Sequence, residues 1–357
     1  MISKLVQNPV CFLSDTPVPG DGIAISSRIR LARNLEGYPF PCNMPEALKK
    51  EVCAIVRSAA VKSRIFPAKS AYFFNPDELA ENELEILVER RLASVDFIKK
   101  PQGTLLIVSS DEHFSIMVNE EDQLRIQGIA PGFMLDGLWK KMSAIDDKLN
   151  NHLAYACDSK YGFLTSCPSN TGTGLRASVM LHLPGLVATG LIAPTLEGIA
   201  KLHLAVRGLR GEGSKNHGNL FQISNQYTLG LNEEQSIMEM NAAVIRLIDG
   251  EKSARLKLLD SKRTMLFDKV GRAYGMLKYA HNLPLDEAFY AISCLRLGVD
   301  LGMFNAIDIA TVNRLQIAVQ PGHLGCQLEN GETNGNCDEK RAWLCRAILN
   351  SGMRKGA

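Results

Sequence analysis

Residues 25–31 read ISSRIRL, and this short stretch decides which kind of fold the chain can adopt. Successive side chains of a β-strand point to opposite faces of a sheet. Ile29 and Leu31 would therefore share an apolar face, while Arg28 and Arg30 would share the other. A strand with this pattern belongs in a sheet with one packed and one polar face, which is typical of antiparallel sheets.

The same alternation returns in three later stretches of the chain. Residues 121–127 (EDQLRIQ) would place Glu121 and Gln123 on the polar face together with an arginine. Residues 175–183 (LRASVMLHL) alternate in the same way, and the run at 203–207 (HLAVR) ends in an arginine. Arginines therefore recur on the polar faces of strands that otherwise form a core. They are Arg28, Arg30, Arg125, Arg176 and Arg207.

Helical spacing of apolar residues covers other parts of the chain and dominates its last third. Before the middle of the chain, the helical segments are 45–62, 76–93 and 133–149. After residue 232 they are 233–259, 261–280, 284–297, 305–318 and 338–349. The fold class that we expect is α+β. Residues 1–256 would form a domain around an antiparallel sheet, and residues 257–357 a small helical domain.

Composition narrows the functions that the chain can have. The net charge is only +2, from 40 basic and 38 acidic side chains, so charge favours neither nucleic acid nor a membrane surface. The nine cysteines include no C-x-x-C pair, so neither a zinc ribbon nor a thioredoxin motif is indicated. From the cysteine spacing we expect no metal site. We find no signal peptide and no apolar run of about 18 residues, so we expect reduced thiols and a cytoplasmic location.

A row of arginines on a sheet suits phosphate oxygens, because guanidinium is a rigid fork of hydrogen-bond donors. The usual nucleotide motifs do not account for such a site. There is no Walker-type loop, no H-R-D and no D-F-G element, and the G-x-G-x-x-A at 172–177 precedes a strand pattern instead of a helix. The alternative is that the arginines form surface salt bridges on a solvated face.

Five segments of the chain resemble the ATP:guanido phosphotransferases, also called phosphagen kinases, and most closely the bacterial protein-arginine kinases of that family. They are SSRIRLARNLEGYPFP (26–41), NEEDQLRIQ (119–127), CPSNTGTGLRASVMLHLPGL (167–186), VRGLRGEGS (206–214) and GNLFQISNQ (218–226). RLGVDLG (296–302), QPGHL (320–324) and DEKRA (338–342) are similar to the helical domain of the same branch. The resemblance implies an antiparallel-sheet catalytic domain followed by a helical dimerisation or regulatory domain.

The resemblance also implies which residues bind ATP, with Mg²⁺ bridging phosphate oxygens and few direct protein ligands to the metal. The implied nucleotide contacts are Ser26, Ser27, Arg28, Ile29, Arg30, Arg91, Arg125, Arg176, Ala177, Ser178, Val179, Met180, Arg207, Gly208, Leu209, Arg210 and Gly211. Arg91 stands where the family has a histidine near the adenine, and could instead be a charge on a helix surface.

The implied catalytic residues are Glu121, Glu212 and Cys167. A pair of carboxylates can hold the two N–H edges of a guanidinium group and take up its proton as the N–P bond forms. Cys167 matches the family's reactive cysteine and would help to orient the substrate. Asp122 either assists through water or is structural, and Gln123 replaces a family histidine.

A second site implied by the resemblance binds phosphoarginine in the helical domain. The family element R-D-x-x-R-A reads Cys337, Asp338, Glu339, Lys340, Arg341 and Ala342 in this chain. Because a cysteine stands where an arginine would meet the phosphate, we expect this regulatory site to be weakened or lost.

The function that we expect is ATP-dependent phosphorylation of arginine side chains in proteins. Phosphagen kinases of small substrates carry a helical N-terminal domain of about 100 residues, whereas the SSRIR strand begins at residue 26 here. A kinase of free arginine or another small guanidino compound, and a non-catalytic regulator, are the alternatives. The resemblance further implies a homodimer, an McsA-like zinc-bearing activator, the Clp protease system, and a role in stress response and protein quality control.

Overall fold

The computed structural model describes residues 2–20, 22–66, 71–207, 218–328 and 336–352. Its centre is one eight-stranded sheet in the order β2-β3-β4-β5-β1-β8-β10-β9, in which every neighbouring pair is antiparallel. The strands are β1 Ala24–Arg33, β2 Ala71–Phe74, β3 Leu105–Ser109, β4 Phe114–Val118, β5 Leu124–Pro131, β8 Leu175–His182, β9 Leu204–Arg207 and β10 Leu220–Asn225. A separate hairpin pairs β6 Cys157–Asp158 with β7 Gly162–Phe163. The predicted antiparallel sheet is thus confirmed.

The register of the central strands brings arginines side by side on one face. Arg30 of β1 lies opposite Arg176 of β8, and Arg28 lies opposite Ser178 two residues along. Ala32 of β1 lies opposite Arg125 of β5 on the other side. Facing residues of an antiparallel pair are about 5 Å apart, so the like charges of Arg30 and Arg176 repel each other.

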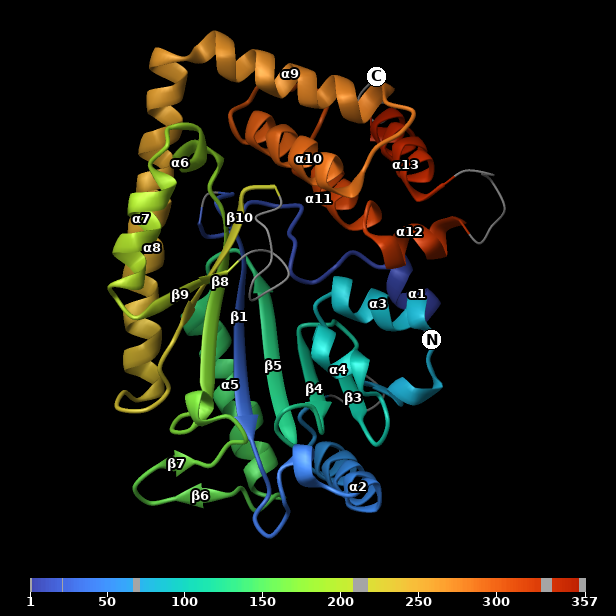
Figure 1. Cartoon of the computed structure of the whole chain (residues 1–357), viewed down its shortest axis with the longest axis vertical. Helices are drawn as coiled ribbons and strands as arrows, with labels where there is room; N and C mark the ends of the chain where they lie inside the picture. Colours follow the sequence, from blue (N-terminus) through green and yellow to red (C-terminus); the bar gives the residue numbers. More distant parts are fainter. Residues whose placement is uncertain (1, 21, 67–70, 208–217, 329–335, 353–357) are drawn as a thin grey trace.

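The opposite face of the sheet is packed by helices. Figure 1 shows α5 (Leu135–Asn150) behind the sheet, α2 (Glu46–Lys62) at its lower edge and α8 (Glu233–Ser261) along one side. Ile29, Leu31 and Val179 are fully buried in this core, as the alternation predicts. The first two hundred residues also contain α1 Ile2–Gln7, η1 Pro41–Asn43, η2 Pro76–Glu78, α3 Glu81–Glu89, α4 Val95–Lys99, η3 Pro168–Asn170, α6 Pro184–Ala188 and α7 Ile192–Ala200.

A second hydrophobic core lies within the helices that follow α8. These are α9 Arg263–Tyr279, α10 Leu285–Asp300, α11 Ile309–Ala318, α12 Pro321–Leu328 and α13 Cys337–Gly352, and they sit above the sheet in Figure 1. The start of α12 docks on α3, where Glu89 accepts hydrogen bonds from the backbone N–H groups of Gly322 and His323. No helix of the described part is long and apolar enough to cross a membrane.

Buried charges join the two cores. Arg255 of α8 donates to Glu251 at 2.7 Å and to Asp300 of α10 at 3.2 Å. Glu251 also accepts the backbone N–H groups of Gly185 and Leu186 at the start of α6. The junction therefore depends on one arginine that neutralises two buried carboxylates.

The strand expected over 121–127 begins only at Leu124. Residues 119–123 form a tight bend, in which the N–H of Asn119 donates to the carbonyl of Gln123 and Asn119 has φ 62°. Asn tolerates this left-handed conformation better than most residues, so the chain can turn here. Glu121 therefore lies in a bend, and Gln123 is fully buried, with its amide bonded to the backbone of Leu35 and Pro39.

Candidate active site

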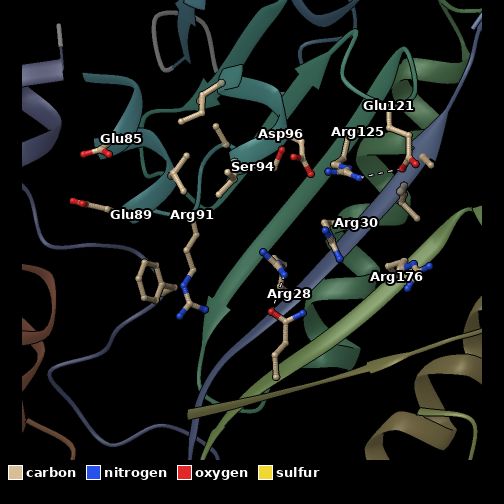
Figure 2. Close-up of a pocket in the computed structure, with 18 of the residues that line it drawn as sticks. Arg28, Arg30, Glu85, Glu89, Arg91, Ser94, Asp96, Glu121, Arg125 and Arg176 are labelled. Carbon is tan, nitrogen blue, oxygen red and sulfur yellow. Dashed lines mark hydrogen bonds and ion pairs between the residues drawn. The ribbon is translucent and has the colours of Figure 1, made fainter. Parts of the chain in front are cut away.

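The polar face of the sheet lines a cavity of about 630 Å³. Side chains from β1, β5 and β8 form its floor, and residues of α3, α11 and α12 reach its other side (Figure 2). Five of the arginines singled out from the sequence line it: Arg28, Arg30, Arg91, Arg125 and Arg176. Glu121 and Cys167 line it as well.

Arg30 is central to a cluster of positive charge. Its Nε atom is buried and has no hydrogen-bond partner among the described residues. Burial, together with repulsion from the other arginines of the cluster, holds the pKa of Arg30 well below its usual value. A buried donor without a partner costs free energy, and several like charges repel one another. The cluster therefore fits a ligand with several negative charges and many acceptor oxygens, such as a triphosphate.

Polar side chains hold two of the neighbouring arginines in place. Arg28 donates to Gln222 of β10 at 3.0 Å. Arg176 donates through Nε to Asn170 at 3.2 Å and through Nη2 to Ser169 at 3.3 Å. These hydrogen bonds help to fix the orientation of the two guanidinium groups, whose planar forks of donors suit phosphate oxygens.

Glu120 is a site residue that the strand alternation did not single out. It is buried, and Arg125 donates to it at 2.6 Å. The Ser94 hydroxyl, which caps α4, also donates to Glu120. If a regular strand began at residue 121, Glu120 would lie outside its polar face. Glu120 reaches Arg125 only because the chain bends here. The clue in the sequence was the run of three consecutive acids, 120–122, ahead of an arginine-bearing strand.

Glu121 and Cys167 lie at one end of the cavity. Glu121 Oε2 accepts a hydrogen bond from Asn170 Nδ2 at 3.3 Å and lies 3.5 Å from Arg125 Nη2. Cys167 is the residue before η3, its thiol is 3.1 Å from the Ser169 hydroxyl, and its carbonyl accepts from Thr165 Oγ1 at 2.7 Å. Asn170 thus bonds both Glu121 and Arg176, and links this end of the cavity to the arginine cluster.

Asp122 faces away from the cavity and holds its rim. It is 3% exposed, and its Oδ1 atom accepts from Asn34 Nδ2 at 2.8 Å and from the backbone N–H of Ser166 at 2.7 Å. Burial raises the pKa of Asp122 above its usual value. These contacts fix Ser166, the residue next to Cys167. The position of Asp122 therefore agrees with a structural role. Gln123 likewise bonds the loop after β1, at Leu35 N and Pro39 O.

Arg91 lies to one side of the cluster, at the opposite end of the cavity from Glu121 (Figure 2). Helix α3 ends at Glu89, and Arg91 adopts the left-handed conformation with φ 59°, so it is not a helix-surface charge. Its guanidinium carbon lies 4.3 Å from the centre of the Phe12 ring, and Nη1 donates to the Ser26 hydroxyl at 3.3 Å.

Seven other implied nucleotide contacts have described side chains, and none of these lines the cavity. Ser27 bonds Gly132 and Met134 in the interior, and the remaining side chains belong to packed or buried parts of β1 and β8. This second group comprises Ser26, Ile29, Ala177, Ser178, Val179 and Met180. Arg207 is the last residue of β9, where its backbone pairs with Gln222 of β10. Glu212 and Gly208, Leu209, Arg210 and Gly211 lie outside the described residues.

The expected phosphoarginine element opens α13. Cys337 is exposed at its first turn. Arg341 is buried and donates to Asp338, to the Leu283 carbonyl at 2.8 Å and to the Val319 carbonyl at 2.9 Å, while Ala342 lies in the second core. Arg341 thus ties α13 to its neighbours.

Among the described residues, no group of three or more histidine, cysteine or carboxylate side chains is arranged to hold a metal ion. A divalent cation in the cavity would need phosphate oxygens and water for most of its ligands.

Comparison with family models places the chain beside two known domains. Residues 52–254 match the C-terminal catalytic domain of the ATP:guanido phosphotransferases. Residues 263–356 match the C-terminal domain of the protein-arginine kinase McsB.

Similar proteins cover nearly the whole chain. A protein-arginine kinase of Moorella thermoacetica is 43% identical over 332 residues, which are 93% of this chain and 95% of the relative. One from Desulforamulus reducens is 42% identical over 352 residues, 98% of each chain. Among solved structures, a lombricine kinase has a TM-score of 0.56 at 22% identity over 70% of each chain. A duplicated taurocyamine kinase from Schistosoma mansoni has a TM-score of 0.57 at 22% identity, over 76% of this chain and 40% of that one. At such identities, these structures support the fold alone.

Proposed function

The chain belongs to the ATP:guanido phosphotransferase family, and we propose that it phosphorylates arginine side chains of proteins with ATP, at the arginine-lined cavity. One observation carries the assignment of the site. Four arginines, one of them with a buried and unpartnered Nε, converge beside Glu121 and Cys167 in a single cavity. A polyphosphate would neutralise the cluster, and the substrate guanidinium would meet the carboxylate end.

The arginines would bind and align the triphosphate. Arg28, Arg30, Arg125 and Arg176 supply fixed donors on a rigid sheet, so little reorganisation is needed as charge develops on the transferred group. Their partners Gln222, Asn170 and Glu120 keep them in place.

The substrate guanidinium would lie between Glu121 and Cys167, and Glu212 would complete the pair of carboxylates. A guanidinium nitrogen attacks the γ-phosphorus, the N–P bond forms, and the bond from that phosphorus to the bridging oxygen breaks with ADP as the leaving group. The N–H proton passes to a carboxylate. Glu121 is placed to accept it, because its carboxylate lines the cavity and is held there by a hydrogen bond from Asn170 and an ion pair with Arg125.

Mg²⁺ is proposed to accompany ATP, since phosphate oxygens can supply most of the ligands of this cation. The protein's own part would then be to hold the phosphates and to exclude water.

The division into a catalytic domain at 1–256 and a helical domain at 257–357 is proposed on the two separate cores, although α8 runs through residue 256 without a break. We further propose a homodimer, an McsA-like activator, a link to Clp-dependent protein quality control under stress, and action in the cytoplasm. The last of these is supported by nine free cysteines.

Labelled ATP tests the proposed reaction. Incubation with casein or with free arginine should give acid-labile, alkali-stable label on casein. Label on free arginine alone would instead support a small-substrate kinase, and ATP binding without any transfer would support a non-catalytic regulator. Glu121→Gln should lower transfer by 100-fold or more while ATP binding changes little, and Glu287→Gln, on an exposed turn of α10, is the matched control.

The element at 337–342 is proposed to respond weakly to phosphoarginine, because Cys337 offers no charge to a phosphate. Free phosphoarginine should leave the rate unchanged within about twofold. Clear activation would contradict this proposal without touching the assignment of the active site.

A further inference from the structure

The residues that follow α1 form a strap, residues 8–15, which runs from α1 past α11 toward β1 (Figure 1). Arg90 holds the beginning of the strap by donating to the carbonyls of Asn8 and Pro9 at 3.1–3.3 Å. Arg90 is itself fixed by a buried ion pair with Glu112 at 2.7 Å. Cys11 Sγ donates to the Glu112 carbonyl at 3.1 Å, so the strap is fastened to the sheet domain at three points.

The end of the strap is fastened to the helical region. Asn313 of α11 donates to the Ser14 carbonyl at 2.9 Å and to Asp15 at 3.1 Å. Arg296 of α10 donates to Asn313 and to Gln316, and Gln316 lines the cavity. The strap therefore has a defined conformation where it passes the cavity.

Phe12 is the strap residue that meets the cavity. It is 1% exposed, lines the cavity, and lies under the Arg91 guanidinium with 4.3 Å between the guanidinium carbon and the ring centre. Behind the ring, Val10 and Ile129 form a small apolar cluster. The ring of Phe12 thus packs against the Arg91 guanidinium on one side and against Val10 and Ile129 on the other.

Other contacts also fix Arg91. Its carbonyl accepts from Gln127 Nε2 at 2.7 Å, and its left-handed backbone is unusual for a residue other than glycine. Such a conformation persists only where the surroundings impose it, and it is often associated with a functional position. No carboxylate of the described residues forms an ion pair with Arg91, and burial lowers its pKa to about 10.

The position of Arg91 suggests what it meets. The cluster that fits phosphates lies farther along the cavity, toward Glu121, so Arg91 lies at the end where the base of a bound nucleotide would be (Figure 2). Guanidinium is planar and stacks on aromatic rings. One face of Arg91 is on Phe12, Ile317 packs against the same apolar cluster as Phe12, and both Phe12 and Ile317 line the cavity, so this end of it is apolar enough to suit a flat heterocycle.

We propose that Phe12 is a positioning residue of the nucleotide site, which holds the Arg91 guanidinium flat so that the purine base of ATP stacks on its other face. The strap is thereby part of the active site. This inference rests on the proposed function insofar as ATP is taken to bind in this cavity.

Phe12→Leu tests the proposal, because leucine fills space but has no π face. The KM for ATP should rise roughly 2- to 30-fold, the range that loss of a cation–π contact allows, while kcat and the KM for casein stay within twofold. Phe12→Trp keeps an aromatic face and should retain ATP affinity. Val6→Ala is the matched control, because Val6 is a partly buried apolar residue of the same N-terminal segment that belongs to another apolar cluster and does not line the cavity.

Inorganic tripolyphosphate separates base stacking from general damage to the site. It carries the phosphates but no base, so its inhibition constant should be the same in the wild type and in Phe12→Leu. A double-mutant cycle adds a second check, since Phe12→Leu should cost little further ATP affinity in an Arg91→Ala background.

Three outcomes would overturn the proposal. They are unchanged ATP affinity in Phe12→Leu, equal weakening of ATP and tripolyphosphate, or an equal effect of Val6→Ala. Thermal unfolding of each variant identifies the case in which the fold itself is lost, and Phe12→Trp then carries the test. Equilibrium binding measures the affinities for ATP and tripolyphosphate without turnover. Failure of phosphoryl transfer would therefore count against the proposed function alone.

Discussion

At the scale of single residues, Arg30 lies where burial and like charge act against stability. Its Nε atom has no acceptor among the described residues, and Arg176 faces it across the strands. The depressed pKa means that the folded protein holds the charged form of Arg30 less readily than the unfolded chain does. Sites built for a ligand often keep such costs, because the ligand removes them.

Replacing Arg30 should therefore move stability and activity in opposite directions. Arg30→Met should raise the free energy of unfolding of the ligand-free protein by about 1–2 kcal/mol, because a poorly compensated charge is removed. It should also weaken ATP binding by about 10- to 100-fold, since charged hydrogen bonds to phosphate are lost. Denaturant unfolding and equilibrium binding measure the two effects. Arg272→Met on exposed α9 should change neither, and a destabilised Arg30→Met would contradict the argument.

Asp122 illustrates a residue that acts through a neighbour. Asp122→Ala should leave the Ser166 N–H and the Asn34 amide without their acceptor, at about 1–3 kcal/mol for each buried donor. The loop that carries Cys167 would loosen, and kcat should fall about 10-fold or more. Asp122→Asn keeps an acceptor oxygen and should retain most of the rate. Similar kcat values in the two variants would show that the loop does not depend on this oxygen.

The pH dependence of stability gives a separate prediction for Asp122. Its pKa in the folded protein is raised, so its contribution to stability is fully present below about pH 4 and is lost as the pH rises through the folded value. Asp122→Asn removes this dependence. Between pH 4 and pH 7, the free energy of unfolding should therefore decrease less with pH in Asp122→Asn than in the wild type. The same decrease in both proteins would count against the raised pKa of Asp122.

At the scale of the element, two places next to strands fix important side chains. They are the bend between β4 and β5 and the end of β8. The bend turns Glu120 and Glu121 toward Arg125, and Asp122 toward the opposite side. At the end of β8, His182 is fully buried, with Nε2 2.8 Å from the Ser293 hydroxyl of α10. This contact joins the sheet to the helical region.

His182 should make that junction sensitive to acid. Burial, then the charges of Arg255 and Arg296, hold its pKa well below the usual value. The resulting contribution to stability is present above about pH 6.5 and is lost as the pH falls below it, at up to about 1.4 kcal/mol per pH unit. His182→Gln should flatten the decrease in unfolding free energy between pH 6.5 and 5. His281→Gln, at an exposed position, should leave the slope unchanged, and equal slopes in all three proteins would refute the assignment.

At the scale of the whole molecule, two cores share one long helix and one buried ion network. Arg255 neutralises Glu251 and Asp300, which come from different parts of the fold. Burial raises the pKa of both carboxyls even with Arg255 present, so Arg255 offsets the cost of burying them only in part. The cavity depends on this junction, because α11 and α12 close one side of it.

Arg255→Ala should leave two buried carboxylates without their cation and lower the free energy of unfolding by about 3–5 kcal/mol. Because the network joins the two cores, we also expect the two cores of the variant to unfold in separate transitions. Calorimetry and denaturant titration measure both effects. Lys257→Ala on the exposed side of the same helix is the control, and equal losses in the two variants would contradict a special role for Arg255.

The sequence by itself determined the sheet and its charged face. Alternation is local, so Ile29 and Leu31 had to share a face opposite Arg28 and Arg30 wherever the strand was placed. The antiparallel sheet, the long helices from residue 233 and the cavity arginines followed from that pattern and from the resemblance. Local patterns did not reveal the short helices α4, α7 and α12, because a few residues carry little periodic information.

Tertiary structure alone decided which groups meet. The left-handed turn at Asn119 removed Glu121 and Gln123 from the strand, and alternation fails wherever the backbone leaves the extended conformation. The meeting of Phe12 with Arg91, about eighty positions apart in the chain, depends on contacts of the strap with both halves of the molecule. The faces of the strands were therefore set locally, whereas the ends of the cavity were set by long-range packing.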